Sequence, residues 1–189
     1  MTEPASRHEG RKATTGCEQA APILPDVLEP GLHVVFCGTQ AGAASAARGA
    51  YYAGPGNKFW TIIHQVGLVP ERFAPERFRE LPRWGIGLTD VAKRSSGPDS
   101  NLRGDHFDVA GLRGRIAAHR PRLLAFNGKR AARAALGAAA GPLAYGRQPG
   151  TFAGAGIFVL PSTSGAAAGY WSPEPWKELA LAMTELDTP

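Results

Sequence analysis

Two neighbouring stretches, VVFCGTQAGAAS at residues 34–45 and GAYYAGPGNKFW at residues 49–60, decide how this chain folds. The apolar start of the first stretch predicts a buried strand, and the small residues after it predict a loop. The second stretch adds an aromatic pair, Tyr51 and Tyr52, followed by the start of a helix. In α/β proteins this order of strand, small-residue loop and helix forms a pocket for a flat ligand.

Length and cysteine content are those of a single domain that needs no cross-links. The chain has 189 residues, which is long enough for a sufficient hydrophobic core. Its two cysteines, Cys17 and Cys37, offer neither zinc-ligand spacing nor a secreted disulfide framework. Since no apolar run reaches transmembrane length and no signal-peptide pattern is present, we expect an intracellular protein located in the cytoplasm.

Charge is distributed unevenly along the chain. Residues 1–30 are rich in Ala, Pro, Thr and Glu and contain more acidic than basic residues, so we expect a disordered N-terminal tail. The formal net charge of the whole chain is +5. Because residues 1–30 are net acidic, the positive charge lies in the expected single domain, residues 31–189. A basic domain favours a polyanionic partner such as DNA, although ordinary surface charge gives the same composition.

Apolar runs predict the strands, and helical spacing predicts the helices. The expected strands are residues 32–37, 85–89, 123–126 and 157–160, and the expected helices are residues 58–66, 108–119, 128–136 and 174–186. Three of these strands are continuously apolar, as in parallel strands that are covered on both faces. The predicted fold class is therefore α/β, a three-layer α/β/α sandwich with a short, mainly parallel four-stranded sheet.

Polar groups follow each expected strand. They are Gly38-Thr39-Gln40, Thr89-Asp90, Asn127-Gly128-Lys129 and Pro161-Ser162-Thr163-Ser164-Gly165. Because the carboxyl ends of parallel strands share one edge of a sheet, these groups should converge on one site. The chain has no dinucleotide fingerprint and no Walker sequence, and its histidines lack triad or metal spacing. We expect no metal and no cofactor, and a small-molecule nucleotide-binding enzyme would lack its phosphate motif.

Five ordered blocks of residues resemble a known family. They are Phe36-Cys37-Gly38-x-x-x-Gly42, Gly49-x-x-Tyr52-Ala53-x-Pro55-x-Asn57-Lys58-Phe59-Trp60, Gly87-x-Thr89, Gly128-Lys129 and Leu160-Pro161-x-x-Ser164-Gly165. From about residue 32 to residue 186 the chain resembles the uracil-DNA glycosylase superfamily, and within it the mismatch-specific uracil/thymine-DNA glycosylase branch. The resemblance implies a monofunctional DNA glycosylase without metal or cofactor. Such an enzyme flips uracil, or another deaminated or damaged base, out of mismatched or single-stranded DNA and leaves an abasic site in base excision repair.

The resemblance also assigns the residues that hold the base. Tyr52 stands at the position of the aromatic residue that stacks on the flipped base, and Ser45 lies in the loop that contacts the polar edge of the base. The other expected base-binding residues are Gly38, Thr39, Asn57 and Ser162. Without the resemblance, Tyr52 is compatible with core packing and Tyr51 with the surface, and Asn57 with a cap of the following helix.

The expected catalytic residues depart from the family pattern. Gln40 stands where the branch has Asn to hold the attacking water, and Ser162 stands where strongly active relatives have His and the mismatch branch has Asn. Asp90, which follows the expected strand 85–89, would compensate, because a carboxylate can orient water and stabilise a cationic sugar. We therefore expect Asp90 and Gln40 to be catalytic. The alternative for Asp90 is a helix cap or an ion pair with Lys93.

DNA contacts are expected on both sides of this site. In relatives the loop formed here by Ser164, Gly165 and Ala166 enters the duplex, and its residues are small in this chain. Uracil in single strands or in U·G mismatches should therefore be processed better than uracil in U·A pairs. The expected contacts to the DNA backbone are Lys58, Lys93, Arg94, Lys129 and Arg130, each of which is also compatible with plain solvated surface.

A second function stays open at this point. The small wedge, together with Gln40 and Ser162, is compatible with a weakly active or inactive member of the family that binds damaged or single-stranded DNA.

Overall fold

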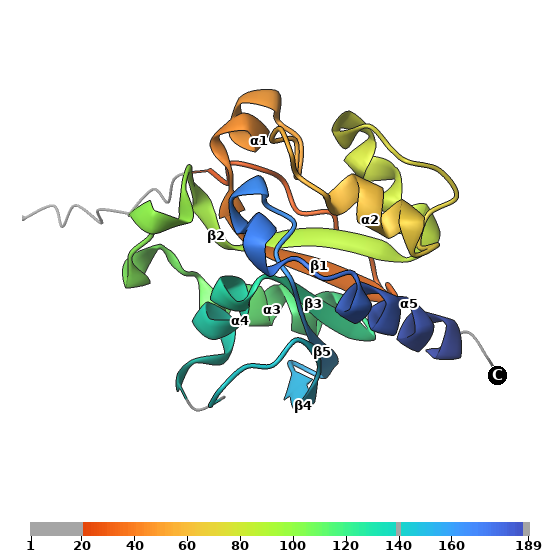
Figure 1. Ribbon diagram of the computed structural model, residues 1–189. Helices are drawn as coiled ribbons and strands as arrows, with labels where there is room; N and C mark the ends of the chain where they lie inside the picture. The colour runs from red at the N-terminus through yellow and green to blue at the C-terminus, as the bar shows by residue number, and fades with distance from the viewer. Residues whose placement is uncertain (1–20, 139–140, 187–189) are drawn as a thin grey trace, which may run out of the picture.

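The computed structural model describes residues 21–138 and 141–186, which form an α/β sandwich around one sheet (Figure 1). The strands are β1 (Val34–Ala41), β2 (Ile86–Ser96), β3 (Leu123–Asn127), β4 (Gly146–Phe152) and β5 (Ala155–Leu160). Their order is β2-β1-β3-β5-β4, and all neighbours are parallel except β4, which runs antiparallel to β5. The predicted fold class is confirmed, with five strands in place of the expected four.

The additional strand is β4, an edge strand that lacks the apolar run used to predict the others. Its sequence is GRQPGTF, and most of its residues are at least partly exposed. Pro149 cannot donate a ladder hydrogen bond, and the register with β5 shifts between Gln148 and Thr151. Apolar runs identify strands that are covered on both faces, so an exposed edge strand of this kind escapes them.

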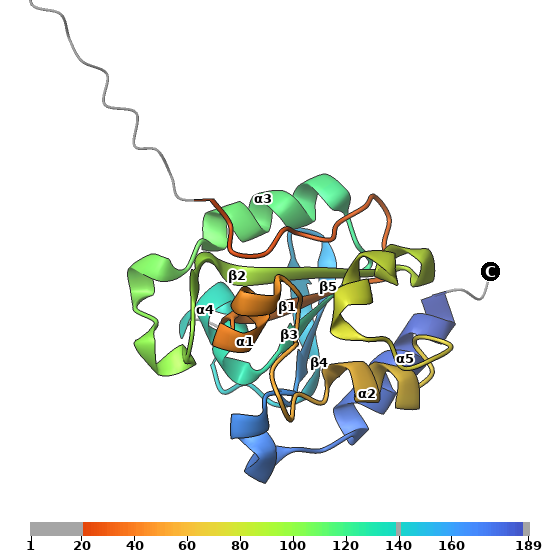
Figure 2. The ribbon, with the colours of Figure 1, turned by 90° about the horizontal axis from the view of Figure 1, so that it is seen from above.

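The helices form the two outer layers. The α-helices are α1 (Ala43–Arg48), α2 (Phe59–Gln65), α3 (Val109–His119), α4 (Lys129–Leu136) and α5 (Glu174–Leu186), and the 3-10 helices are η1 (Pro75–Trp84), η2 (Asp99–Asn101), η3 (Gly104–His106) and η5 (Gly165–Tyr170). One face of the sheet packs against α2, η1 and α5, and the other packs against α3 and α4 (Figures 1 and 2).

Strand β1 lies inside the sheet and joins the two layers. On one face, Phe36 makes an edge contact with Phe59 of α2 and stacks on Trp176 of α5. On the other face, Val35 and Cys37 pack in the cluster that includes α3 and α4. The pairing of β1 with β3 ends at Cys37, so the next residue, Gly38, borders the site described below.

Strand β2 is longer than the sequence predicts. It continues to Ser96, so Asp90 lies inside the strand, in register with Gly38 of β1, and is not at a strand end. Because the residue lies within a strand, the helix-cap alternative for Asp90 is wrong. The sequence predicts an end at residue 89 because charged residues follow at positions 90 and 93, but both side chains are buried in the structure.

Residues 21–30 differ from the disordered tail expected for residues 1–30. Leu24 and Val27 are buried, and Val27 pairs with Leu88 of β2 in an antiparallel bridge. The packed domain therefore starts before residue 31, and residues 1–20 lie outside the described part of the chain. Within the described residues, no helix combines the length and apolar character that a membrane crossing needs.

Candidate active site

A cavity of about 690 Å³ opens at the carboxyl edge of the parallel strands. The cavity collects residues from β1, α1, the loop before α2, β2, β3, α4 and the loop after β5. Of the residues predicted for the site and its DNA contacts, Gly38, Thr39, Gln40, Ser45, Tyr52, Asn57, Asp90, Lys129, Arg130, Ser162, Ser164, Gly165 and Ala166 line this cavity, and Lys58, Lys93 and Arg94 do not. The convergence expected from strand direction alone is present in the structure.

Asp90 is a buried carboxylate that lies directly over Gly38. Its exposed fraction is only 3%. A Cβ atom built on Gly38 would lie well under 3.0 Å from Asp90 Oδ1 and 3.5 Å from the hydroxyl of Tyr52. The carboxylate and the phenol hydroxyl therefore approach the same point, and only a glycine at position 38 leaves room for both.

The carboxylate also affects the groups around it. Burial, followed by the nearby charge of Asp90, raises the pKa of Tyr51, of Tyr52 and of the Cys37 thiol. All three groups therefore stay protonated at neutral pH. The two tyrosine hydroxyls can act as hydrogen-bond donors beside the carboxylate.

Gln40 is held in one orientation by the loop that follows β2. Its side-chain amide nitrogen donates to the backbone carbonyls of Gly97 at 3.0 Å and Pro98 at 3.1 Å. These two bonds fix which end of the amide is the oxygen. Gln40 Oε1 is buried without a hydrogen-bond partner among the described residues, and Gln40 is one of the residues that line the cavity.

Tyr52 combines an aromatic face with strained backbone geometry. Its ring stacks on Phe59, with 4.1 Å between ring centroids, and the residue lines the cavity. Its φ of 55° lies in the left-handed region, which costs a non-glycine residue ~1–3 kcal/mol and is characteristic of functional sites. The hydroxyl is buried, and the Asn127 amide approaches it without a hydrogen bond of good geometry.

Tyr51, whose alternative placement was the surface, is buried. Its hydroxyl accepts a hydrogen bond from the Lys93 ammonium at 3.0 Å, and its backbone carbonyl accepts one from the Trp60 indole at 3.1 Å. The two neighbouring tyrosines therefore have different roles. Tyr51 belongs to the core beneath the cavity, and Tyr52 belongs to the cavity itself.

Three of the predicted base-binding side chains also hold the local backbone. Ser45 lies in helix α1, not in a loop, and its hydroxyl accepts from the backbone N–H of Ala53 at 3.1 Å. Asn57 accepts from the backbone N–H of Phe59, the first residue of α2, at 3.0 Å, while the N-cap position of α2 is Lys58. Ser162 accepts from the backbone N–H of Ser164 at 3.3 Å. These contacts shape the loops, and the serine hydroxyls retain a proton to donate.

A side-chain bridge that sequence reasoning missed joins the two later strands at the cavity. Asn127, at the end of β3, donates to the hydroxyl of Thr163 at 2.8 Å and accepts from its backbone N–H at 3.0 Å. Both residues are buried. In the sequence, Asn127 is an amide that directly follows the expected strand 123–126. Its bridging role could be identified only together with its distant partner, Thr163.

The predicted DNA contacts divide into exposed and buried groups. Lys129 and Arg130 are exposed at the start of α4; the Lys129 ammonium lies 4.4 Å from the ring centroid of Tyr145. Lys58 is partly buried, with its ammonium 4.9 Å from the ring centroid of Trp171. Lys93 is buried and forms a 2.8 Å ion pair with Asp26, so its predicted contact with the DNA backbone is wrong.

The loop expected to enter DNA forms the short helix η5. A Cβ at Gly165 would lie 3.5 Å from the carbonyl of Pro55 and 3.7 Å from that of Gly56. The loop after β5 therefore packs closely on the loop before α2, and Ser164, Gly165 and Ala166 are exposed at the mouth of the cavity.

A second cavity of about 790 Å³ lies on the other side of the loop formed by residues 52–57. Its described lining contains two arginines, Arg48 and Arg72, and no acidic residue. Arg72 is exposed and forms no ion pair with any residue that the structure describes. The two cavities share Ala44, Tyr52, Gly54, Pro55 and Asn57 in their linings.

No group of three or more metal-ligating side chains lies close enough together to hold a metal ion within the described ranges. The residues that line the first cavity include the carboxylate of Asp90 and three side-chain amides, those of Gln40, Asn57 and Asn127.

Comparison with known proteins agrees with this arrangement. The uracil DNA glycosylase superfamily matches residues 25–182. A provisionally assigned uracil DNA glycosylase from Methanosarcina acetivorans, whose structure was solved by solution NMR, is 25% identical, with a TM-score of 0.60 over 87% of this chain and 97% of that chain. The matched residues include every residue that lines the first cavity except Leu24, and they begin within the N-terminal segment that packs on β2. This chain belongs to the uracil DNA glycosylase superfamily of hydrolytic DNA repair enzymes.

Proposed function

We propose that this chain is a monofunctional glycosylase that excises uracil from single-stranded or mismatched DNA. The observation that carries the proposal is the buried carboxylate of Asp90, which meets the Tyr52 hydroxyl over Gly38 in the first cavity. A volume of about 690 Å³ is suited to a flipped nucleotide, since small-molecule sites usually measure roughly 300–1,000 Å³.

The base would be held by stacking and by polar groups in the wall of the cavity. Tyr52 offers an aromatic surface that is already fixed against Phe59, so little order has to be gained on binding. Gln40 Oε1 and the Tyr52 hydroxyl supply an unpaired acceptor and a donor, the two functions that a uracil edge or an attacking water would satisfy.

Hydrolysis would then use Asp90. The water oxygen bonds to C1′ of the deoxyribose while the N-glycosidic bond breaks and its electron pair leaves with the base. Asp90 takes the proton from the water and stabilises the positive charge on the sugar, as carboxylates do in glycoside hydrolysis. The base anion takes a proton from solvent, and an abasic site remains.

A monofunctional mechanism fits the position of the lysines. A lyase step needs a free amine that attacks the sugar. Lys93 is paired with Asp26 and Tyr51, while Lys129, which lines the cavity, lies at its exposed rim with its ammonium over Tyr145. The Lys93 ammonium is buried and engaged by its two partners, and the Lys129 ammonium lies over an aromatic ring, so neither is offered as a free Schiff-base nucleophile.

The substrate form follows from the small loop at the cavity mouth. Ala166 and Gly165 offer little bulk to fill the gap that a flipped base leaves in a duplex. The protein therefore contributes little to unstacking the base, and cleavage should be faster in DNA whose base is already unpaired. Lys58, Lys129 and Arg130 would contact phosphates near this mouth, and the cavity with Arg48 and Arg72 would extend the path of the strand.

The test uses end-labelled oligonucleotides with one uracil, as a single strand, in U·G and in U·A. Strand scission only after alkali, fastest for the single strand and U·G, is the expected result. Scission without alkali would contradict the monofunctional mechanism, and equal rates on all three forms would contradict the substrate preference.

The second candidate function is binding of damaged or single-stranded DNA with little or no cleavage. It is favoured by the Gln40 amide, whose nitrogen is fully engaged with the Gly97 and Pro98 carbonyls. Binding without scission in the same assay would select it. An Asp90→Asn protein that cleaves at the rate of the unmodified enzyme would remove Asp90 from the mechanism.

A further inference from the structure

The N-terminal segment, residues 21–30, lies along the outer edge of β2 (Figure 2). The backbone N–H of Ile23 donates to the carbonyl of Lys93 at 2.8 Å, and Val27 exchanges two backbone bonds with Leu88. Asp26 lies between these two attachment points. Its carboxylate is thereby held against the middle of β2, the part of the strand that contains Asp90.

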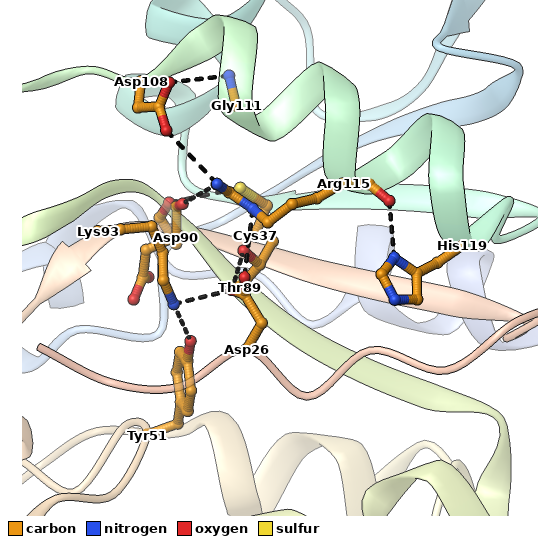
Figure 3. A network of polar contacts seen from close by, with 11 residues as sticks. Asp26, Cys37, Tyr51, Thr89, Asp90, Lys93, Asp108, Gly111, Arg115 and His119 are labelled. Carbon is orange, nitrogen blue, oxygen red and sulfur yellow. Dashed lines mark hydrogen bonds and ion pairs between the residues drawn. The ribbon is translucent and has the colours of Figure 1, made fainter. Parts of the chain in front are cut away.

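Asp26 is the centre of a network of charges and hydroxyl groups (Figure 3). One carboxylate oxygen accepts from the Thr89 hydroxyl at 2.6 Å and from the Lys93 ammonium at 2.8 Å. The other oxygen lies 3.3 Å from Nε of Arg115, which comes from α3. A single carboxylate therefore neutralises cations from two different elements.

Lys93 is an unusual residue to find at this place. Its side chain is only 4% exposed, and burial of an unpaired ammonium is strongly unfavourable. Asp26 supplies the counter-charge, and the ammonium uses a second proton to bind the Tyr51 hydroxyl at 3.0 Å. Loss of Asp26 would leave this positive charge buried three residues away from Asp90.

The network is attached to Asp90 as well. Arg115 Nη2 donates to the backbone carbonyl of Asp90 at 3.1 Å, while Nη1 lies 3.5 Å from the carboxylate of Asp108. Asp90 belongs to a cluster of interacting titratable and charged groups that also contains Cys37 from β1, Tyr51 and Tyr52 from the loop before α2, Lys93 from β2, Arg115 from α3 and Asp26 from the N-terminal segment. Asp26 is the acid among these neighbours.

We infer that Asp26 is a positioning residue for Asp90: it holds and neutralises Lys93 and Arg115, and so sets the charge environment in which Asp90 works. The inference rests on the proposed function, because it gives Asp90 its catalytic role. It also makes the segment before residue 31 a part of the active site.

Two substitutions with opposite electrostatic signs test the inference. Asp26→Asn removes a negative charge and leaves two cations beside Asp90, which favours the ionised carboxylate. Lys93→Met removes a positive charge and disfavours it. In single-turnover cleavage of a uracil-containing single strand, the acid limb of the pH–rate profile should move to lower pH for Asp26→Asn and to higher pH for Lys93→Met. Each shift should be roughly half a pH unit to one pH unit.

The double variant Asp26→Asn/Lys93→Met should return the acid limb close to its original position. The position of the limb does not depend on how much protein is folded and active, so a loss of stability cannot imitate opposite shifts. Glu29→Gln is the matched control, because Glu29 is an exposed acid of the same segment and should leave the limb unchanged.

The outcomes separate the two proposals. Suppose that Asp90→Asn is inactive. The role of Asp26 is then overturned if the acid limbs of Asp26→Asn and Lys93→Met do not move, or if both move in the same direction. Full activity of Asp90→Asn would instead overturn the proposed function, whatever the two limbs do.

Discussion

Replacement of Gly38 by alanine tests the placement of Asp90 most directly. The new Cβ would lie well under 3.0 Å from Asp90 Oδ1, whereas an ordinary contact of a Cβ lies between 3.4 and 4 Å. Either the carboxylate or strand β1 therefore has to move by about 1 Å. Since a misplacement of this size costs about 10²-fold in rate, Gly38→Ala should cleave uracil DNA about 100-fold more slowly.

The same substitution overpacks a buried site, so it should also lower the free energy of unfolding by about 1–3 kcal/mol. Single-turnover rates at saturating enzyme, measured well below the melting temperature, separate the two effects. Gly114→Ala is the control, because Gly114 is an exposed residue inside α3 and its Cβ would meet nothing within 4 Å. A Gly38→Ala enzyme that is folded and within threefold of the original rate would refute the placement of Asp90 as the reacting carboxylate.

Three further predictions follow from single contacts. Tyr52→Phe keeps the stacked ring and should leave the alkaline side of the pH–rate profile unchanged up to pH ~10. The reason is that burial and Asp90 raise the pKa of the Tyr52 hydroxyl above its usual value. An alkaline limb below pH ~10 that disappears in Tyr52→Phe would contradict this. Asn127→Ala leaves Thr163 without its buried partners and should cost about 1–3 kcal/mol in denaturant unfolding, so an unchanged midpoint would show that the bridge is dispensable. Arg72→Ala should lower the slope of log affinity against log salt for single-stranded DNA by about 1. The control is Arg147→Ala, because Arg147 is an exposed arginine on β4, and its slope should not change. Equal slopes for the two variants would show that the second cavity does not contact the DNA.

Much of the site could be predicted because the carboxyl ends of parallel strands must meet. Continuous apolar runs identified β1, β3 and β5, and the polar residues after these strands do line one cavity. Helix starts were also close, since Asp108 caps α3 through the backbone N–H of Gly111. The exposed edge strand β4, the short helix α1 and the packed segment 21–30 lacked these signals and were missed.

Contacts between distant segments could not be predicted in this way. The partner of Lys93 lies 67 residues earlier, and the carbonyls that fix Gln40 lie 57 and 58 residues later. Local spacing has no information about such pairs, because they depend on how far β2 extends and on which segment covers its edge. For the same reason Lys93 looked like a surface contact for DNA although it is buried.

Sequence by itself determined that the residues after the parallel strands reach one cavity, because the direction of a parallel strand fixes where its carboxyl end lies. Tertiary structure alone decided what those residues can do there. It placed Asp90 over a glycine, left the oxygen of Gln40 unpaired and gave the buried Lys93 its counter-charge from Asp26. The physical reason is that a carboxylate, an amide or an ammonium takes its chemistry from burial and from its neighbours, and packing sets both.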